Sequence, residues 1–323
     1  MVLPPAAAID LGSNTIRLLV AAAQEGAPHA LLLRQETTRL GEGLEPGRCF
    51  KPQALERAWR VLEDFRAAAK ALGVASILVG ATGAVREAAD GEALLARIEL
   101  DLGLRTRLLS GVEEAALAAA GVLAILKPPG GAFLLFDLGG RSTEFALVAQ
   151  GEVRRAVSLE LGAVALTERF FRQDPPSAEA VRTLRAEVAR VLAAGLPAGF
   201  AMGKTGPLIG TAGTATTCAA VLQGLEPYDP ERINGFAITR EALQALFDRL
   251  VRLPMSERAR IPGLPPDRAD ILPAGAGVIL EILEYFKETC LLVSDAGLLE
   301  GLWLVAAGVR SETWTATGIG ARV

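Results

Sequence analysis

Two stretches of the chain place an aspartate just before a short turn of glycine and small polar residues. The first is Asp10 with Gly12, Ser13, Asn14 and Thr15, and the second is Asp137 with Gly139, Gly140, Arg141, Ser142 and Thr143. Glycine lets backbone N–H groups converge on an anion without a Cβ in the way, and neighbouring hydroxyl and amide groups add donors. A single copy would favour an ordinary β-hairpin turn. Two copies, with a third turn of similar composition at 208–216, favour phosphate binding.

The carboxylates beside these turns indicate a metal ion. An aspartate that precedes a phosphate turn is electrostatically unfavourable unless a divalent cation neutralises it or it positions a water molecule. Asp10, Asp137 and Glu144 are therefore candidate metal ligands, and the alternative for each is a turn-capping or solvated carboxylate. Glu113 and Glu114 follow Ser110 at the expected start of a helix, where local evidence favours capping, because carboxylates interact well with a helix N-terminus.

Composition excludes several classes of function. The 323 residues suffice for about two domains, and the net charge of −4 gives no general attraction to nucleic acid or anionic lipid. One histidine, His29, and three scattered cysteines, Cys49, Cys218 and Cys290, exclude zinc-finger and two-histidine metal sites. We interpret the cysteines as core or surface thiols in a reducing compartment.

No membrane segment is expected. The longest apolar run, 115–126, is shorter than the roughly 18 residues that span a bilayer, and the N-terminal residues lack the basic region of a signal peptide. We therefore expect a cytoplasmic protein without nucleic acid or membrane partners.

Strands and helices are expected to alternate along the chain. Hydrophobic periodicity predicts strands at 6–10, 16–22, 31–34, 36–40, 77–79, 106–109, 132–136 and 144–149, and helices at 52–72, 91–101, 112–126 and 177–194. Two consecutive prolines and two glycines at 128–131 mark a boundary, after which the aspartate turn recurs. This pattern predicts two α/β lobes from a duplicated unit, with a ligand cleft between them.

A series of motifs carries a family resemblance. They are IDLGSNTIRL (9–18), ATGAVREA (81–88), SGVEEA (110–115), DLGGRSTE (137–144), LGAV (161–164), GTATT (213–217), PGL and RAD (262–264 and 268–270) and SDAG (294–297). In this order the chain resembles the exopolyphosphatase/guanosine pentaphosphate phosphohydrolase (Ppx/GppA) family of the actin-like, sugar-kinase and Hsp70 superfamily, in its short two-domain form.

The resemblance implies a fold and an activity. The fold would be two actin-like (ribonuclease H-like) lobes, 1–124 and 125–300, the first completed by a C-terminal helix within 301–323. The activity would be hydrolysis of a terminal phosphoanhydride, in inorganic polyphosphate or at the 5′ end of guanosine pentaphosphate, with Mg²⁺ or Mn²⁺. Its partners would be polyphosphate or guanosine penta- or tetraphosphate, the latter linked to the stringent response, and a homodimer is compatible with it.

The resemblance also implies residue roles. Glu114 would be the catalytic base, Arg86 would neutralise transition-state charge, and Asp137 and Glu144, with Asp10, would hold the metal. Phosphoryl oxygens would be bound by the turn residues Gly12, Ser13, Asn14, Thr15, Gly139, Gly140, Arg141, Ser142 and Thr143, with Gly213 and Thr214 behind them. Arg17 and Arg268 would contact more distant parts of the anion, and for Arg268 the alternative is a surface ion pair with Asp270 or another nearby acid.

Several positions depart from the family pattern. Ala116, Ala165, Ala296 and Leu299 replace frequent arginines, Asn234 replaces a histidine, and Arg141 replaces a third glycine. Fewer cations should hold a long polyanion less tightly. The departures keep open a non-catalytic alarmone- or nucleotide-binding regulator, and the shared turns keep open an ATP-dependent small-molecule kinase.

Arg141 has two alternative orientations. A guanidinium that points inward would bind phosphate, which is the interpretation we favour, and one that points outward would be a solvated turn residue. A Cβ in this turn requires a negative φ, and we expect the flanking glycines to take the positive values.

Overall fold

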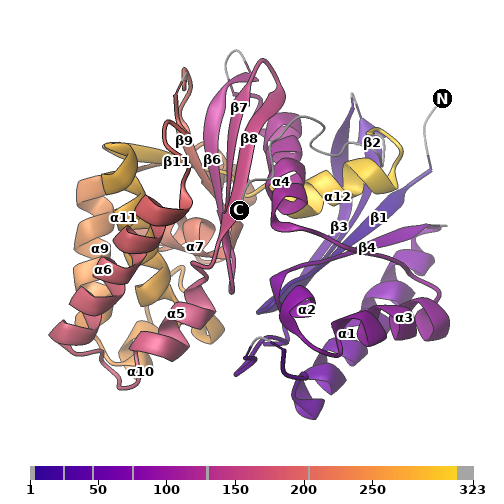
Figure 1. The fold of residues 1–323 in the computed structure, drawn as a ribbon. Coiled ribbons are helices and arrows are strands. Elements are labelled where there is room, and N and C mark those ends of the chain that lie inside the picture. Colours follow the sequence, from indigo (N-terminus) through magenta and orange to yellow (C-terminus); the bar gives the residue numbers. More distant parts are fainter. Residues whose placement is uncertain are drawn as a thin grey trace. The chain divides into compact units, whose positions relative to one another are not determined.

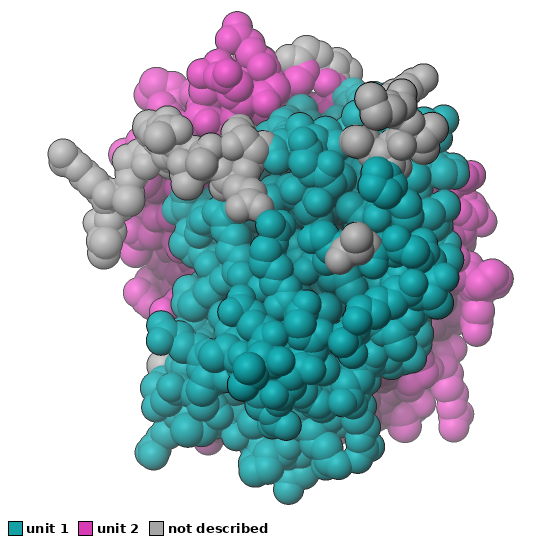
Figure 2. Space-filling model, turned by 90° about the vertical axis from the view of Figure 1, so that its right-hand side faces the viewer, with its two compact units in different colours: residues 1–127, 296–323 teal, residues 128–295 magenta. Residues whose placement is uncertain are grey.

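The computed structural model describes residues 4–24, 26–45, 47–74, 76–128, 131–202 and 204–310. By internal contacts the chain divides into unit 1, Met1–Lys127 with Ala296–Val323, and unit 2, Pro128–Asp295 (Figure 2). The ranges expected for the two domains, 1–124 with 301–323 and 125–300, stay a prediction. Within the described part of the chain, none of the helices combines the length and hydropathy that a bilayer span needs.

Unit 1 is built on a five-stranded mixed sheet in the order β3-β2-β1-β4-β5 (Figure 1). Its strands are β1 (Ala6–Leu11), β2 (Thr15–Gln24), β3 (Ala27–Thr37), β4 (Ile77–Ala81) and β5 (Arg105–Leu108). β1 pairs antiparallel with β2 and parallel with β4. The expectation of separate strands at 31–34 and 36–40 was wrong, because β3 pairs with β2 in one register from Leu32 to Thr37.

Helices cover both faces of this sheet. They are α1 (Pro52–Ala71), α2 (Gly83–Glu87), α3 (Gly91–Leu102), α4 (Gly111–Ile125) and α12 (Leu298–Ala306). In α1, Ala58, Leu62 and Phe65 are buried at helical spacing and form one core with alternate residues of β1. On the other face, α12 packs on β1 and α4, and Trp303 Nε1 donates hydrogen bonds to backbone carbonyls of β1 and β2. The part of the predicted C-terminal helix beyond residue 310 lies outside the described residues.

Unit 2 has a six-stranded mixed sheet in the order β10-β11-β9-β6-β7-β8. Its strands are β6 (Phe133–Leu138), β7 (Thr143–Ala149), β8 (Glu152–Leu159), β9 (Leu208–Thr211), β10 (Ala237–Thr239) and β11 (Cys290–Val293). The helices are α5 (Ala163–Phe170), α6 (Ala178–Gly195), α7 (Ala212–Gln223), α8 (Pro230–Ile233), α9 (Arg240–Arg252), α10 (Met255–Arg258) and α11 (Leu272–Phe286), with a 3₁₀ turn, Pro266–Arg268. α11 is almost wholly buried and packs on α6, α7 and α9.

The two units repeat one arrangement. Each unit contains an antiparallel hairpin, β1–β2 in unit 1 and β6–β7 in unit 2. The first strand of each hairpin also pairs with a parallel strand, β4 in unit 1 and β9 in unit 2. Gly12 N donates to Thr15 O at 3.1 Å, and Gly139 N donates to Ser142 O at 3.0 Å. The duplicated aspartate turns predicted from the sequence therefore close in the same way.

Candidate functional site

The predicted site residues fall into two groups, one in each unit. Unit 1 contains Asp10, Gly12, Ser13, Asn14, Thr15, Arg17, Arg86 and Glu114, and unit 2 contains Asp137, Gly139, Gly140, Arg141, Ser142, Thr143, Glu144, Gly213, Thr214 and Arg268. Each group is described within its own unit.

The turn of unit 1 requires glycine because of close packing. A Cβ on Gly12 would lie 2.8 Å from Thr15 O, although the φ of Gly12 is not positive. Ser13 is buried, and its carbonyl accepts a hydrogen bond from Gly41 N at 2.8 Å. Asn14 Nδ2 is buried, and no group among the described residues accepts a hydrogen bond from it. Since buried donors are nearly always paired, this amide is suited to an anionic ligand.

Asp10 lies opposite Arg17 across the β1–β2 hairpin. Arg17 Nε is 3.5 Å from Asp10 Oδ2, and both side chains are largely buried. Burial raises the pKa of the Asp10 carboxyl above its ordinary value, and the adjacent guanidinium opposes this rise. The two residues predicted for separate roles are therefore paired with each other.

The turn of unit 2 is held by the N-terminus of α5. Ala163 N donates to Gly139 O, and Val164 N donates to Gly140 O, both at 3.0 Å. The first amides of a helix lack partners inside the helix, so the carbonyls of the turn satisfy them. This contact explains why the LGAV motif accompanies the second aspartate turn in the sequence.

Arg141 lies against α5. A Cβ on Gly162 would come within 2.2–2.3 Å of three backbone atoms of Arg141, so only glycine fits beneath the turn. Arg141 Nη1 is 3.9 Å from Glu168 Oε2, and its side chain is 9% exposed. The alternative of a solvated side chain was therefore wrong. Its φ is negative as expected, but neither Gly139 nor Gly140 has a positive φ, so that expectation was also wrong. The turn closes through the α5 contacts without left-handed residues.

Thr143 supports the turn from beneath. Its side chain is fully buried, and Oγ1 donates to Leu161 O at 2.5 Å. A hydroxyl has one proton to donate, so this group cannot also donate to a phosphoryl oxygen. The phosphate contact predicted for Thr143 stays a prediction, and it would not use this hydroxyl proton. The neighbouring Ser142 is also buried, and its hydroxyl has no such competing bond among those described.

Asp137 and Glu144 face each other across the β6–β7 hairpin. Residues opposite each other on antiparallel strands project to the same face with Cβ atoms about 4.5–5.5 Å apart. Glu144 is buried, and Ser158 Oγ on β8 donates to Glu144 Oε1 at 2.7 Å. Two hard carboxylates on one face, one of them oriented by a hydroxyl, fit a divalent cation such as Mg²⁺ or Mn²⁺.

The third turn joins β9 to α7. A Cβ on Gly213 would lie 1.6 Å from Arg268 Nη1, so the guanidinium rests directly on this glycine. Arg268 is 8% exposed, so the surface location that the alternative gave to its side chain was wrong. The side chain of Thr214 packs against Gly275 of α11. Thr214 thus positions α7, and Arg268 occupies the space beside Gly213.

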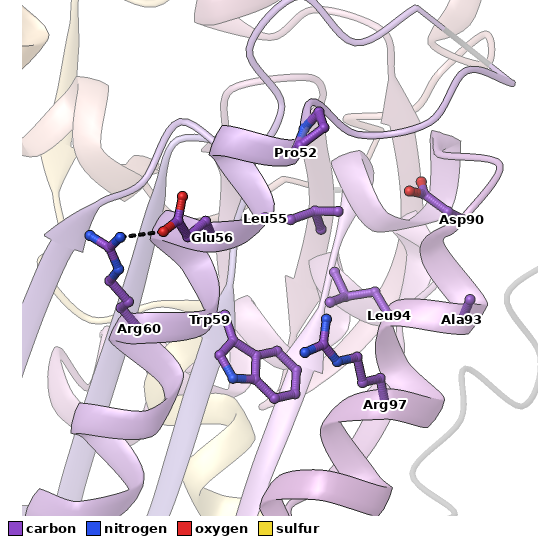
Figure 3. A pocket seen from close by; sticks show the side chains of 9 residues that line it. All are labelled: Pro52, Leu55, Glu56, Trp59, Arg60, Asp90, Ala93, Leu94 and Arg97. Atoms are coloured by element: carbon purple, nitrogen blue, oxygen red, sulfur yellow. Dashed lines mark hydrogen bonds and ion pairs between the residues drawn. The ribbon is translucent and has the colours of Figure 1, made fainter.

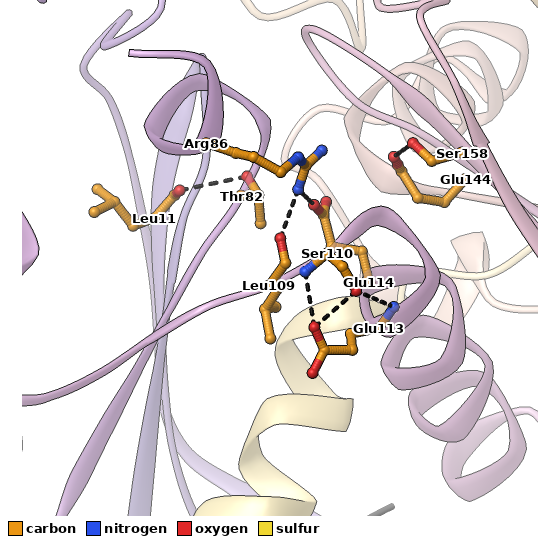
Figure 4. Close-up of polar contacts among 9 residues, drawn as sticks. All are labelled: Leu11, Thr82, Arg86, Leu109, Ser110, Glu113, Glu114, Glu144 and Ser158. Carbon is orange, nitrogen blue, oxygen red and sulfur yellow. Dashed lines mark hydrogen bonds and ion pairs between the residues drawn. The ribbon is translucent and has the colours of Figure 1, made fainter. Parts of the chain in front are cut away.

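Glu113 and Glu114 have different partners (Figure 4). Glu113 forms a capping box with Ser110: its Oε2 accepts from Ser110 N at 2.8 Å, and Ser110 Oγ accepts from Glu113 N. Glu114 takes no part in this cap; its buried Oε1 accepts from Arg86 Nη1 at 2.5 Å. Arg86 Nη1 also donates to Leu109 O at 2.6 Å. The structure therefore separates a capping glutamate from one held by a guanidinium.

The capping box shifts the pKa of Glu113. Burial alone would raise the pKa of Glu113, but hydrogen bonds from Ser110 and the Arg107 guanidinium outweigh it and lower the pKa below its ordinary value. The charge of Glu113 is thus stabilised in the folded state.

Two other features carry none of the predicted chemistry. A pocket of about 600 Å³ lies between α1 and α3, where Arg97 stacks on Trp59 with its Cζ 4.1 Å from the ring centroid (Figure 3). None of the predicted site residues lines it. Cys218 is buried, and burial raises the pKa of its thiol to about 12, which excludes a thiolate nucleophile at neutral pH. Cys49 and Cys290 are exposed free thiols.

Sequence reasoning missed three supporting residues. Ser158 orients Glu144, Gly162 makes room for the Arg141 backbone, and Glu168 approaches its guanidinium. Ser158 lies on β8, a strand that was not predicted, so the sequence did not indicate that Ser158 pairs with Glu144. Gly162 could have been singled out as the glycine of the LGAV motif.

Two α/β units, each with an aspartate turn at the hairpin of a mixed sheet, define a protein of the actin-like class. The model of the Ppx/GppA phosphatase family matches residues 19–307, and the chain belongs to that family. Both the family resemblance and the two-lobed actin-like α/β fold expected from the sequence are thereby confirmed.

Relatives and solved structures match nearly the whole chain. Exopolyphosphatase 2 of Mycobacterium tuberculosis is 32% identical over 327 residues, which cover 95% of this chain and 100% of that protein. The structure of the Aquifex aeolicus PPX-GPPA enzyme is 33% identical with a TM-score of 0.78, covering 94% of this chain and 99% of that one. An exopolyphosphatase structure from Cytophaga hutchinsonii is 27% identical with a TM-score of 0.85, covering 94% and 98%.

Proposed function

We propose that this protein hydrolyses the terminal phosphoanhydride of inorganic polyphosphate, with the 5′ end of guanosine pentaphosphate as a second substrate. The observation that carries the proposal is the separation of Glu114 from the helix cap. Glu113 alone caps α4, so capping does not account for Glu114, which is buried and fixed by Arg86. A fixed, buried carboxylate is suited to general base catalysis. Relatives described as exopolyphosphatases support the choice of polyphosphate.

Unit 1 would supply the group that activates water. Glu114 would accept a proton from the attacking water as the water oxygen bonds to the terminal phosphorus, and the bridging oxygen would leave with the shortened chain. Such assistance contributes about 10²- to 10⁴-fold in rate. Arg86 would keep the carboxylate in one orientation through its 2.5 Å hydrogen bond and place positive charge near the reacting phosphoryl group. Asn14 Nδ2 would donate to a phosphoryl oxygen.

Unit 2 would supply the metal-binding carboxylates. Asp137 and Glu144 would hold Mg²⁺ or Mn²⁺, because two carboxylates on one face of the β6–β7 hairpin repel each other unless a cation lies near them. A divalent cation bound there would neutralise charge on phosphoryl oxygens. The backbone of the Gly139–Gly140 turn, held by α5, and the Ser142 hydroxyl would bind the same anion.

Two exposed cysteines indicate the cellular compartment. The exposed free thiols of Cys49 and Cys290 suit a reducing compartment, so we propose that the protein acts in the cytoplasm.

The test is phosphate release from polyphosphate and from guanosine pentaphosphate, with Mg²⁺, with Mn²⁺ and with EDTA. We expect metal-dependent release from both, with the higher kcat/KM on polyphosphate. Glu144→Gln should abolish most activity, whereas Glu152→Gln, an exposed glutamate on β8 of the same sheet, should not. Binding of guanosine tetraphosphate without any phosphate release would instead indicate a regulator. ADP formation that requires a second substrate would indicate a kinase.

A further inference from the structure

The two aspartate turns place residues of opposite charge at the same point. The seventh residue after Asp10 is Arg17, and the seventh residue after Asp137 is Glu144. In both hairpins this residue lies directly opposite the aspartate, in register between antiparallel strands. One repeat thus pairs its aspartate with a cation, and the other pairs it with a second carboxylate.

This difference has an electrostatic consequence for metal binding. In unit 2, a divalent cation would relieve the repulsion between the Asp137 and Glu144 carboxylates. In unit 1, the Arg17 guanidinium, with Nε at 3.5 Å from Asp10 Oδ2, already balances the aspartate charge. A divalent cation bound to Asp10 would have to displace or repel this guanidinium, and both groups are largely withdrawn from the solvent that would screen the repulsion.

The pairing also constrains Arg17. A long arginine side chain loses considerable rotamer freedom when it binds a ligand, and an ion pair that anchors it beforehand reduces that loss. Asp10 lies on β1 and Arg17 on β2, beside the turn that carries Ser13 and Asn14. An anchored guanidinium at this place would favour the binding of an anion that reaches the turn.

We infer that Asp10 is a positioning residue that orients Arg17 toward the polyanionic substrate, and that the divalent cation is held by the Asp137–Glu144 pair without Asp10. The inference rests on the proposed function for the identity of the anion and the need for a metal. It reassigns Asp10, which the sequence alone placed among the metal ligands.

The first test measures Mn²⁺ binding to the full chain without substrate, by electron paramagnetic resonance or calorimetry. Asp137→Asn and Glu144→Gln should weaken binding by at least about tenfold, because loss of even an outer partner of a metal costs that much. Asp10→Asn, which keeps the shape of the side chain, should bind Mn²⁺ within about twofold of wild type. A tenfold loss in Asp10→Asn, or wild-type binding in Glu144→Gln, would overturn the inference.

The second test is a double-mutant cycle on the KM for polyphosphate. Arg17→Gln should raise KM about 10- to 100-fold, the range expected for loss of a charge-assisted hydrogen bond. Asp10→Asn should raise KM about three- to tenfold with little change in kcat, and the double variant should be no worse than Arg17→Gln. Additive effects, or a fall in kcat that extra Mn²⁺ restores, would show that Asp10 acts independently of Arg17.

The two tests separate this inference from the proposed function. If wild-type protein binds Mn²⁺ and releases phosphate but Asp10→Asn loses the metal, the inference fails and the function stands. If wild-type protein binds no Mn²⁺, the proposed metal dependence fails and so does the assignment of the cation to unit 2. The KM cycle then still decides the link between Asp10 and Arg17.

Discussion

Replacing each of two adjacent glutamates by glutamine separates catalysis from helix capping. Glu113→Gln removes a charge from the capping box with Ser110, and Glu114→Gln removes a charge from the partner of Arg86. The two variants make the same chemical change one residue apart in the first turn of α4. Each is therefore the matched control of the other.

The structure predicts similar effects on stability. Glutamine at 113 keeps an oxygen that can accept from Ser110 N, so only the charge assistance of the hydrogen bonds from Ser110 and Arg107 is lost, which costs about 1 kcal/mol in the free energy of unfolding. Glutamine at 114 keeps an oxygen that can accept from Arg86 Nη1, so only the charge assistance of that hydrogen bond is lost, which costs about 1 kcal/mol. The effects on rate should differ greatly. Loss of a general base lowers kcat by about 10²- to 10⁴-fold, whereas weakening the capping box should leave kcat within about threefold of wild type.

The assay is phosphate release from polyphosphate at saturating Mg²⁺, with urea unfolding of both variants measured in the same buffer. A Glu114→Gln variant that keeps kcat within about threefold of wild type would refute the assignment of the base. An equal loss of kcat in Glu113→Gln would show that the position of α4, and not the Glu114 carboxylate, controls the rate.

Three further predictions concern the turns and the cap. Gly162→Ala should lower the free energy of unfolding by about 1–3 kcal/mol and raise the KM for polyphosphate, because its Cβ would lie 2.2 Å from the Arg141 backbone; unchanged unfolding and kinetics would contradict this packing. Arg141→Gly should leave KM within about twofold of wild type at low and high salt, because the guanidinium lies beside Glu168; a KM that is raised at low salt and approaches that of wild type at high salt would instead place it on the substrate. The lowered pKa of Glu113 contributes stability above its ordinary value of 4.5 that is lost as pH falls through the folded-state pKa. The difference in unfolding free energy between wild type and Glu113→Gln should therefore shrink as pH falls below 4.5, and a constant difference would contradict the pKa shift.

The features that sequence predicted best depend on short-range contacts. The turns at Gly12 and Gly139 close by hydrogen bonds to residues three positions along, so their composition carries the information. The same is true of the Ser110–Glu113 capping box. Long amphipathic helices such as α1 were also predicted closely, because apolar residues such as Leu62 and Phe65 recur at helical spacing in the sequence.

The remaining features depend on contacts between distant segments. Arg86 and Glu114 are 28 residues apart, and the local pattern around Glu114 predicted a cap. The approach of Arg268 to Gly213 requires the packing of α7 beside the 3₁₀ turn. Hydrophobic periodicity in the sequence does not predict such packing between distant segments. Once the hairpins are aligned on their aspartates, the equal spacing to Arg17 and Glu144 shows that the two turns carry different charges.

In the proposed reaction, water attacks the terminal phosphorus of a phosphoanhydride. The most direct measurement is the isotopic composition of the first phosphate released from each polyphosphate chain, in a single turnover in water enriched in ¹⁸O. Attack of water on the terminal phosphorus places one solvent oxygen in each orthophosphate released, and this is the result we predict for wild-type protein with Mg²⁺. Orthophosphate without solvent oxygen would show attack elsewhere in the chain, and no release of orthophosphate at all would contradict hydrolysis itself.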